Sequence, residues 1–238
     1  MTIFQAYQTI QQNITAALKR SPHGTRNVTL MGASKSQGLN TIRSAAELGI
    51  LDMGENYAQE LLRKAPLCLD MKIRWHFIGK LQSNKVKHIL PYVSSIGSVD
   101  SLEVAERVGR SLESLDIPRP PVPILIQVNQ GSERQKSGLP PAVVENLFSR
   151  FLQIKGISVV GLMTIPPAVK DKEKMRIYFK EMKALFDKLK LKHDKPEIFQ
   201  HLSMGMSADY EIAVEEGSTL VRIGEALFGP RPPSAVEE

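Results

Sequence analysis

Short apolar runs alternate with stretches of helical periodicity along nearly the whole chain. The apolar runs have the length of β-strands, and the stretches between them place apolar residues three or four positions apart, which is the spacing of one helix face. Strict alternation of strands and helices predicts a parallel sheet, because each parallel pair needs a crossover connection. The pattern predicts eight strands, at residues 28–33, 50–53, 73–78, 94–99, 122–129, 157–163, 198–203 and 220–223.

The stretches between these runs supply the helices of a β/α architecture. They are expected at residues 39–48, 57–64, 84–90, 101–113, 142–151, 175–190 and 208–215. An apolar stripe predicts an additional N-terminal helix and consists of Ile3, Tyr7, Ile10, Ile14 and Ala17. Eight units within roughly 200 residues match a single (β/α)8 TIM barrel, with a doubly wound open sheet as the alternative. We expect one α/β domain over residues 1–229 and a tail at residues 230–238.

Composition narrows the class of protein. Of the 238 residues, 42% are hydrophobic, which is enough to bury a sizeable core. Cys68 is the only cysteine, so an intramolecular disulfide and a CxxC redox or zinc motif are excluded. The chain has no run approaching the roughly 20 apolar residues of a membrane-spanning helix and no secretory signal pattern. The protein is therefore predicted to be soluble and cytoplasmic, with an organelle left open.

The net charge of +6 raises the question of a nucleic-acid partner, because lysine and arginine clusters neutralise phosphates. The densest basic run, at residues 170–195, also carries apolar residues at helical spacing, namely Met175, Phe179, Met182, Phe186 and Leu189. Its lysines therefore form the solvated face of an amphipathic helix. The sequence disfavours a nucleic-acid partner, and no membrane partner is expected.

The functional site of a barrel lies at the carboxyl ends of its strands, where this chain places several polar residues. Lys35 follows the first predicted strand and should emerge at the rim, partly shielded from water. Desolvation and nearby cations lower the pKa of a lysine, and the neutral amine can attack an aldehyde carbon. A solvated surface lysine is the alternative. Glu55 and Asn56 follow the second predicted strand in the same way.

Two further segments predict a phosphate site after the seventh and eighth strands, where barrels often bind phosphate. Ser203 and Ser207 offer hydroxyl donors beside free backbone amides, although Ser207 could simply cap a helix. Arg222 lies in the last predicted strand, two residues before Gly224. An inward-facing arginine needs an acceptor, and a salt bridge with a core carboxylate is its alternative explanation.

Other catalytic templates are absent. The chain has no GxxxxGK[ST] phosphate loop, no GxSxG elbow and no HExxH motif. The five histidines lack the spacing of metal ligands, so no metal is expected. His76 and His201 fall in apolar strand segments and are interpreted as core histidines.

Five strings stand out along the chain: ASK at 33–35, GENYAQE at 54–60, WHFIGKLQSNK at 75–85, LSMGMSADYEIAV at 202–214 and GSTLVRIGEALFG at 217–229. Together they resemble the pyridoxal phosphate homeostasis protein family, whose fold is similar to the barrel domain of alanine racemase. Shorter matches are SVDS at 98–101, QVN at 127–129 with ExxKxG at 133–138, and GLM at 161–163. The departures are slight: LMGAS replaces a more branched first strand, and MGENY an expected FGENY.

The resemblance implies a site for pyridoxal 5′-phosphate (PLP). Lys35 would form a Schiff base with the cofactor, and Asn56 would lie near its ring or hydroxyl. Ser203, Ser207 and the backbone at Gly224 would hold the phosphate. Arg222 would meet the pyridine nitrogen, which weakens the ring as an electron sink.

The resemblance also implies a role in intracellular PLP homeostasis and amino-acid and keto-acid balance, without established catalysis. We expect a monomer that serves apo-enzymes requiring PLP. A minimal PLP-dependent amino-acid racemase is the alternative. None of the five tyrosines falls where the likeness to racemase would place a catalytic base, and they are Tyr7, Tyr57, Tyr92, Tyr178 and Tyr210.

Overall fold

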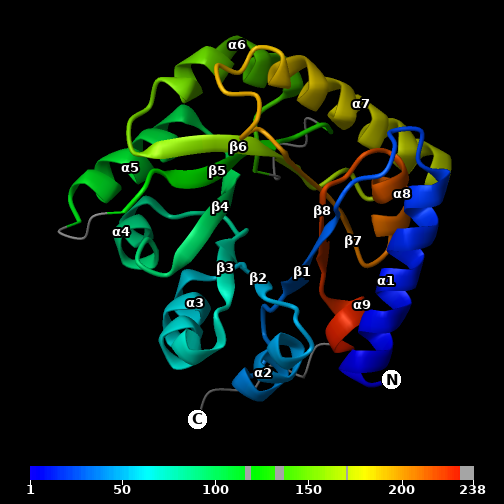
Figure 1. Cartoon of the computed structure of the whole chain (residues 1–238). Coiled ribbons are helices and arrows are strands. Elements are labelled where there is room, and N and C mark those ends of the chain that lie inside the picture. The colour runs from blue at the N-terminus through cyan, green and yellow to red at the C-terminus, as the bar shows by residue number, and fades with distance from the viewer. Residues whose placement is uncertain (116–118, 132–136, 170, 231–238) are drawn as a thin grey trace.

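The eight strands close into a parallel barrel in which each strand pairs with its neighbours in chain order and β8 pairs with β1 (Figure 1). The computed structural model describes residues 1–115, 119–131, 137–169 and 171–230. The strands are β1 (Thr29–Ala33), β2 (Asp52–Glu55), β3 (Arg74–Phe77), β4 (Val93–Val99), β5 (Val122–Val128), β6 (Ile157–Thr164), β7 (His201–Met206) and β8 (Leu220–Ile223). The predicted barrel is confirmed, and the open-sheet alternative is wrong.

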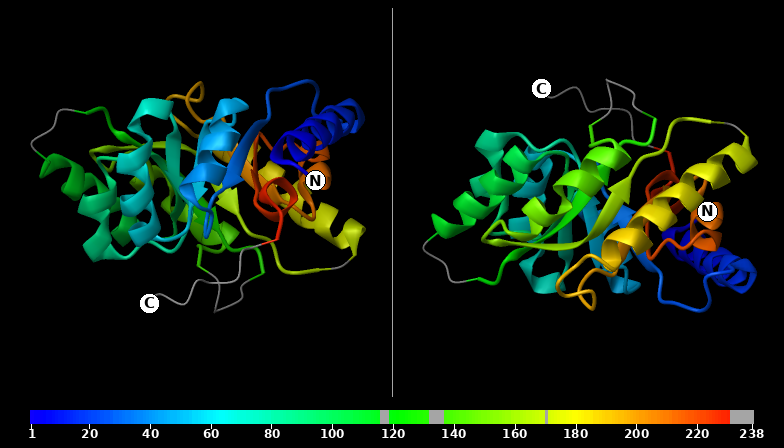
Figure 2. Two further views of the ribbon diagram at one scale, coloured as in Figure 1. Left: turned by 90° about the horizontal axis from the view of Figure 1, so that it is seen from below. Right: turned by 90° about the horizontal axis from the view of Figure 1, so that it is seen from above.

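Helices surround the barrel on its outside (Figures 1 and 2). The α-helices are α1 (Ile3–Arg20), α2 (Leu39–Glu47), α3 (Ala58–Lys64), α4 (Val86–Ile89), α5 (Leu102–Glu113), α6 (Pro141–Leu152), α7 (Lys172–Lys190), α8 (Tyr210–Glu215) and α9 (Glu225–Phe228). Two segments are 3-10 helices: η1 (Ala65–Met71) follows α3 directly, and η2 (Ser83–Lys85) directly precedes α4. None of the helices in these segments is long and apolar enough to cross a membrane.

The predicted N-terminal helix is confirmed as α1, which runs along α8 and α9 (Figure 1). The Thr2 hydroxyl accepts a bond from the Gln5 amide, and the Gln5 side chain accepts one from the Thr2 amide, which completes a capping box. The face toward the barrel is apolar and buries Ala6, Ile10, Ile14 and Ala17. This helix therefore covers the elements that follow β7 and β8.

Apolar side chains fill two separate regions. The larger one lies between the strands and the surrounding helices. Met31, Leu125, Met163 and Leu220 are also buried but do not join that cluster. Glycines leave room for them, since a Cβ added at Gly54 would lie 2.8 Å from the sulfur of Met31. These residues fill the barrel interior, so the barrel is a packed core rather than a pore.

The predicted strand limits are wrong at β2 and β7, which start later than expected. Residues 198–200 precede β7, and the Phe199 ring stacks on Phe186 with centroids 4.8 Å apart. This apolar residue packs between helices instead of opening the strand, so β7 continues to Met206 and Ser203 lies inside it. Glu55 is likewise the last residue of β2 rather than a residue beyond it.

Two short elements, η1 and α9, were not predicted. A four-residue helix such as α9 is too short for any periodicity to reveal it. The predicted tail lies outside the described residues except for Pro230, as do residues 133–136 of the ExxKxG string. The single domain over residues 1–229 stays a prediction.

Candidate cofactor-binding site

The closed barrel brings Lys35 between the ends of β2 and β8. Ala33 at the end of β1 is in register with Gly54 on one side, and Gly32 pairs with Ile223 on the other. A Cβ added at Gly224 would lie 3.6 Å from the Cβ of Ala33. Lys35 itself is half-buried in the turn after β1. The strand ends that precede Lys35, Asn56 and Gly224 are therefore neighbours at the carboxyl end of the barrel.

The turn that carries Lys35 is fixed on both sides. The Ser34 carbonyl accepts a 2.9 Å bond from the Lys64 ammonium, and the Ser36 amide donates a 2.9 Å bond to the Glu60 carboxylate. Ser36 has φ of 61°, a left-handed conformation that costs free energy for a residue with a side chain. The two bonds thus hold the peptide groups flanking Lys35 in a conformation that the chain would not adopt unaided.

A buried ion cluster supplies these two contacts. The Lys64 ammonium lies 2.6 Å from Oε1 of Glu55 and 2.6 Å from Oε2 of Glu60. The Lys64 and Glu55 side chains are 2% and 0% exposed, so both charges are withdrawn from water. Burial raises the pKa of Glu55, while the charge of Lys64 and its hydrogen bond oppose that rise.

Sequence reasoning missed the cluster, although one signal was available. Glu60 and Lys64 stand four positions apart on α3, a spacing at which opposite charges pair on a helix. The pattern could have predicted that pair. It could not have shown that Lys64 is buried or that it also reaches Glu55 and Ser34.

The loops after β7 and β8 meet at Ser207. Its hydroxyl oxygen accepts a 3.2 Å bond from the Ala226 amide at the start of α9. Gly205 adopts φ of +96°, and a Cβ there would lie 2.6 Å from that of Ala213, so only glycine fits between β7 and α8. The cap of α8 is Asp209 rather than Ser207. Ser207 therefore joins two loops instead of starting a helix.

Arg222 points into the barrel and is 4% exposed. Its Nη1 donates to the carbonyl and hydroxyl oxygens of Ser203 at 3.0 and 2.6 Å, and its Nη2 donates to the Thr164 carbonyl at 2.8 Å. Burial lowers its pKa to about 10, and the charge of Asp209 opposes the shift. The guanidinium therefore stays protonated at neutral pH.

Two predictions about these residues need correction. No ion pair joins Arg222 to a carboxylate in the described ranges, so the alternative of a core salt bridge is wrong. Ser203 is 2% exposed and lies within β7 rather than past its end. The late start of β7 moved Ser203 into the barrel wall, where its hydroxyl accepts a bond from Arg222.

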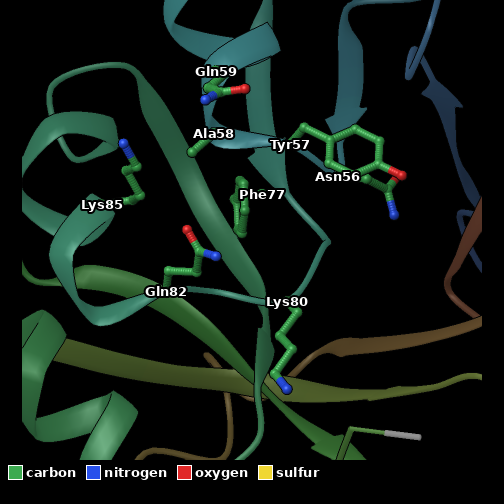
Figure 3. Close-up of a pocket in the computed structure, with 8 residues that line it drawn as sticks. All are labelled: Asn56, Tyr57, Ala58, Gln59, Phe77, Lys80, Gln82 and Lys85. Atoms are coloured by element: carbon green, nitrogen blue, oxygen red, sulfur yellow. The ribbon is translucent and has the colours of Figure 1, made fainter.

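Asn56 is half-buried and lines a cavity of about 340 Å³ beside the mouth (Figure 3). A Cβ added at Gly79 would lie 1.9 Å from the Asn56 carbonyl oxygen. Gly79 thus lies directly against the Asn56 backbone, and the loop after β3 packs on the end of β2. Lys80, Lys85 and Tyr57 also line the cavity.

His76, His201 and Tyr57 differ in their exposure and in their partners. His76 bonds Ser95 and Asp52 at 2.7 and 2.9 Å and is a paired core histidine as expected. His201 is exposed at the start of β7, so its interpretation as a core histidine is wrong. Tyr57 is 59% exposed at the rim. Within the described residues, no group of histidine, cysteine and acidic side chains could hold a metal ion.

Comparison with known proteins agrees with this architecture. The family model for the N-terminal domain of alanine racemase matches residues 6–232. A pyridoxal phosphate homeostasis protein of Aquifex aeolicus is 39% identical over 93% of this chain and 95% of its own length. The protein of that name from Pseudomonas aeruginosa is 35% identical over 97% of this chain and 96% of its own length. This chain belongs to the pyridoxal phosphate homeostasis protein family.

Several solved structures are also similar to this chain. A protein of unknown function from Bifidobacterium adolescentis has a TM-score of 0.86 at 32% identity, with 94% of each chain covered. PipY of Synechococcus elongatus, solved with PLP bound, has a TM-score of 0.80 at 28% identity and covers 96% of this chain and 100% of its own. Alanine racemase of Clostridium difficile, at 16% identity and a TM-score of 0.69, shares the fold.

Proposed function

We propose that this protein binds PLP at the barrel mouth and takes part in PLP homeostasis. One observation carries the proposal: barrel closure brings the strand end before Lys35 next to Gly224, and Ser207 bonds the amide of Ala226, two residues after Gly224. An amine and a phosphate site in adjoining loops match the two ends of this cofactor. The family and the PLP-bound PipY structure support the same function.

The donor set fits an anionic, aldehyde-bearing group. Arg222 is a buried cation whose hydrogen-bond partners in the described part of the chain are carbonyl and hydroxyl oxygens, so it can still stabilise a bound anion. Gly224 has no side chain, and a Cβ there would meet only Ala33, so the backbone is open to a phosphate. The Ser207 hydroxyl accepts a bond from Ala226 and keeps its own proton to donate.

Each residue then has one task. When bound, PLP supplies an aldehyde that condenses with an amine and a ring that withdraws electrons. Lys35 would provide the amine that condenses with the aldehyde, and Asn56 would orient the ring from the end of β2. Ser207 and the Gly224 backbone would hold the phosphate. Ser203 orients Arg222, which would serve the ring nitrogen.

The charge of Arg222 supports a holding role rather than turnover. With a pKa of about 10, the guanidinium is positive at neutral pH and disfavours a proton on a ring nitrogen beside it. An unprotonated ring is a weaker electron sink, so removal of an α-proton from a bound amino acid gains less. We propose that the protein does not turn over amino acids.

Solvent deuterium exchange tests this absence of turnover. The PLP-loaded protein is incubated in D₂O with a panel of amino acids, and the α-proton is followed by NMR. We expect exchange no faster than with free PLP. Exchange well above that rate would favour the racemase alternative instead.

The finer predictions concern partners and location. A monomeric state, a cytoplasmic location and delivery of PLP to apo-enzymes stay predictions from the sequence and its family resemblance. Light scattering gives the mass in solution. Transfer is measured by mixing the loaded protein with an apo-enzyme and following the recovered activity against an equal concentration of free PLP.

The visible spectrum of the purified protein tests the binding proposal. We expect a Schiff-base absorption band in the wild-type protein and its loss in Lys35→Ala, with the circular dichroism spectrum unchanged. Lys19→Ala is the matched control, because Lys19 is exposed in the last turn of α1, outside the barrel mouth. A folded Lys35→Ala protein with the wild-type band would refute the role of Lys35.

A further inference from the structure

A second cavity lies at the start of α2, directly after the turn that carries Lys35. It has a volume of about 540 Å³, and we call it the α2 cavity. Residues 37–41 line it together with Arg63, Lys64 and Leu67, which come from α3 and η1. None of these residues has a part in the proposed binding of PLP. The volume lies within the range of small-molecule sites, so a second ligand fits here.

The first turn of α2 leaves its backbone donors without partners. The helix has nine residues, and its N-cap is Gly38, which has no side chain to accept a bond. The first helical bond is donated by the Ile42 amide to the Gly38 carbonyl. The three preceding amides, those of Leu39, Asn40 and Thr41, therefore have no backbone or side-chain acceptor within the described residues. Three free amides at the positive end of a helix favour an anion.

Gln37 is an independent sign of a ligand at the same place. It is 9% exposed and lines the α2 cavity. Its backbone amide donates to the Ser34 carbonyl at 3.0 Å, but its side-chain amide has no hydrogen bond within the ranges that the structure describes. A nearly buried amide without a partner costs free energy. A ligand in the cavity can supply the missing partner.

Arg63 gives the cavity a cation that is free to bind. It is exposed and has no hydrogen bond or ion pair in the described part of the chain. Lys64 also lines the cavity, but its ammonium is already paired with Glu55 and Glu60. None of the described residues that line the cavity is acidic. A guanidinium binds a phosphate group through two parallel hydrogen bonds, so Arg63 selects this class of anion.

We propose that the α2 cavity binds the phosphate group of a small phosphate monoester. The phosphate oxygens accept from the free amides of α2 and from the Gln37 side chain, while Arg63 neutralises their charge. The cavity is larger than a phosphate ion, and Leu39 and Leu67 give it apolar surface for an organic group. Inorganic phosphate shares the same recognition chemistry, and the experiment distinguishes these two sources.

Calorimetry on the full chain tests the site with phenyl phosphate, inorganic phosphate and phenol. The titrations are made with and without saturating PLP, because PLP occupies the proposed phosphate site at the mouth. We expect phenyl phosphate to bind in both cases and phenol not to bind. Arg63→Met should weaken phenyl phosphate about tenfold, in line with the loss of a charged hydrogen bond. Lys19→Met removes an exposed cation of α1 and should change nothing.

Leu39→Pro tests the free amides directly. Proline removes the first amide of α2 and suits the first position of a helix, and Gly38 already has the extended conformation that precedes proline. Leu39→Ala is the matched control, because it loses the same apolar contacts and keeps the amide. We expect phenyl phosphate to bind several-fold more weakly to the proline variant than to the alanine variant, with equal circular dichroism spectra.

Gln37→Leu removes the side-chain amide and keeps a side chain of similar size. We expect phenyl phosphate to bind several-fold more weakly to this variant, since a neutral hydrogen bond is lost. Thermal unfolding of the ligand-free variant shows whether the fold is kept. Wild-type affinity in a folded Gln37→Leu protein would contradict the role of this amide.

The remaining outcomes decide the site and its ligand. Tighter binding of phenyl phosphate than of inorganic phosphate assigns an organic phosphate, and equal binding assigns inorganic phosphate to the same donors. Binding of neither would overturn the proposal, and so would equal affinity in the wild-type and Arg63→Met proteins. The proposed binding of PLP is tested separately by the absorption band, which involves none of these substitutions.

Discussion

The conformation of the turn that carries Lys35 depends on three charged residues that do not contact the proposed aldehyde. Lys64 donates to the carbonyl before Lys35, and Glu60 accepts from the amide after it, while Glu55 shares the Lys64 ammonium. The Oε2 atom of Glu55 has no hydrogen-bond partner among the described residues. Such a cluster is costly to bury and costly to break, so it fixes one geometry for the turn.

Replacing Lys64 with methionine should strongly destabilise the fold. Glu55 would be left as an unpaired buried carboxylate, and breaking a buried pair in this way costs about 3–5 kcal/mol. Urea denaturation measures the change in the free energy of unfolding. The double variant Lys64→Met with Glu55→Gln removes the stranded charge and should recover part of the loss. A single variant within about 0.5 kcal/mol of wild type would contradict the role of the cluster.

Glu60 permits a milder test of the Lys35 turn. Glu60→Gln keeps an acceptor for the Ser36 amide but removes a charge, whereas Glu60→Ala removes both. We expect PLP affinity to fall in the order wild type, glutamine, alanine, with the alanine variant about tenfold weaker because the Ser36 amide loses its charged acceptor. Titration of the absorption band measures the affinity. Glu113→Ala, on α5, is the control.

Asp52 lies at the opposite end of the barrel, and its pKa predicts how the free energy of unfolding depends on pH. Burial raises its pKa, but bonds from His76 and Arg74 and their charges outweigh burial and hold the pKa well below its usual range. A carboxyl with a depressed folded pKa stabilises the protein above its unfolded pKa, about 3.9, and loses this contribution as pH falls further.

Denaturation between pH 3 and pH 6 measures that contribution. We expect the free energy of unfolding to fall below about pH 4 in the wild-type protein. The fall should be smaller in Asp52→Asn, which lacks the titrating carboxylate. Parallel curves for the two proteins would show that Asp52 is not responsible.

At the scale of elements, the loops after neighbouring strands are positioned by direct backbone contact. Gly79, after β3, leaves no room for a Cβ against the Asn56 carbonyl, and Gly205 is similarly confined beside α8. The spacing of these segments at the mouth therefore depends on glycine, which has no side chain. Helices and parallel strands carry these loops, while α1 packs over α8 and α9.

Gly79→Ala tests this close packing. The added methyl group would overlap the Asn56 backbone, so the two loops must move apart, at a cost of about 1–3 kcal/mol. Because Asn56 would shift, PLP affinity should fall as well. Gly38→Ala is the matched control, since a Cβ there meets nothing within 4 Å. Equal stability and affinity in both variants, measured by denaturation and titration, would show that the contact is unimportant.

For the whole molecule, closure of the barrel is the decisive event. The pairing of β8 with β1 joins residues about 190 positions apart, such as Thr29 and Leu220, and places the first strand end beside the last. The site therefore exists only when the entire barrel has formed. Ligand binding and global stability should be linked.

This linkage predicts a thermal shift. PLP binds only the folded barrel under this scheme, so a concentration 100 times its dissociation constant should add about 2.7 kcal/mol to the free energy of unfolding. Differential scanning calorimetry with increasing PLP should show a rising Tm for the wild-type protein. Lys35→Ala should shift much less at the same concentrations. A wild-type Tm independent of PLP would contradict binding at the folded mouth.

The sequence by itself determined the architecture and the place of the main residues. The alternation of strands and helices predicted eight strands and a barrel, and the order of the motifs put Lys35 after the first strand and Gly224 after the last. These are local properties. Periodicity, turn residues and strand order depend on neighbouring positions and can be read along the chain.

Only the tertiary structure decided which of those residues meet and which are buried. Ser203 is inside β7 because Phe199 packs on Phe186 instead of entering the strand, a contact between distant segments. The ion cluster beneath Lys35 joins β2 to α3. The loop after β3 rests on the end of β2, because Gly79 lies against the Asn56 backbone. Long-range packing selects such contacts, and no local pattern encodes it.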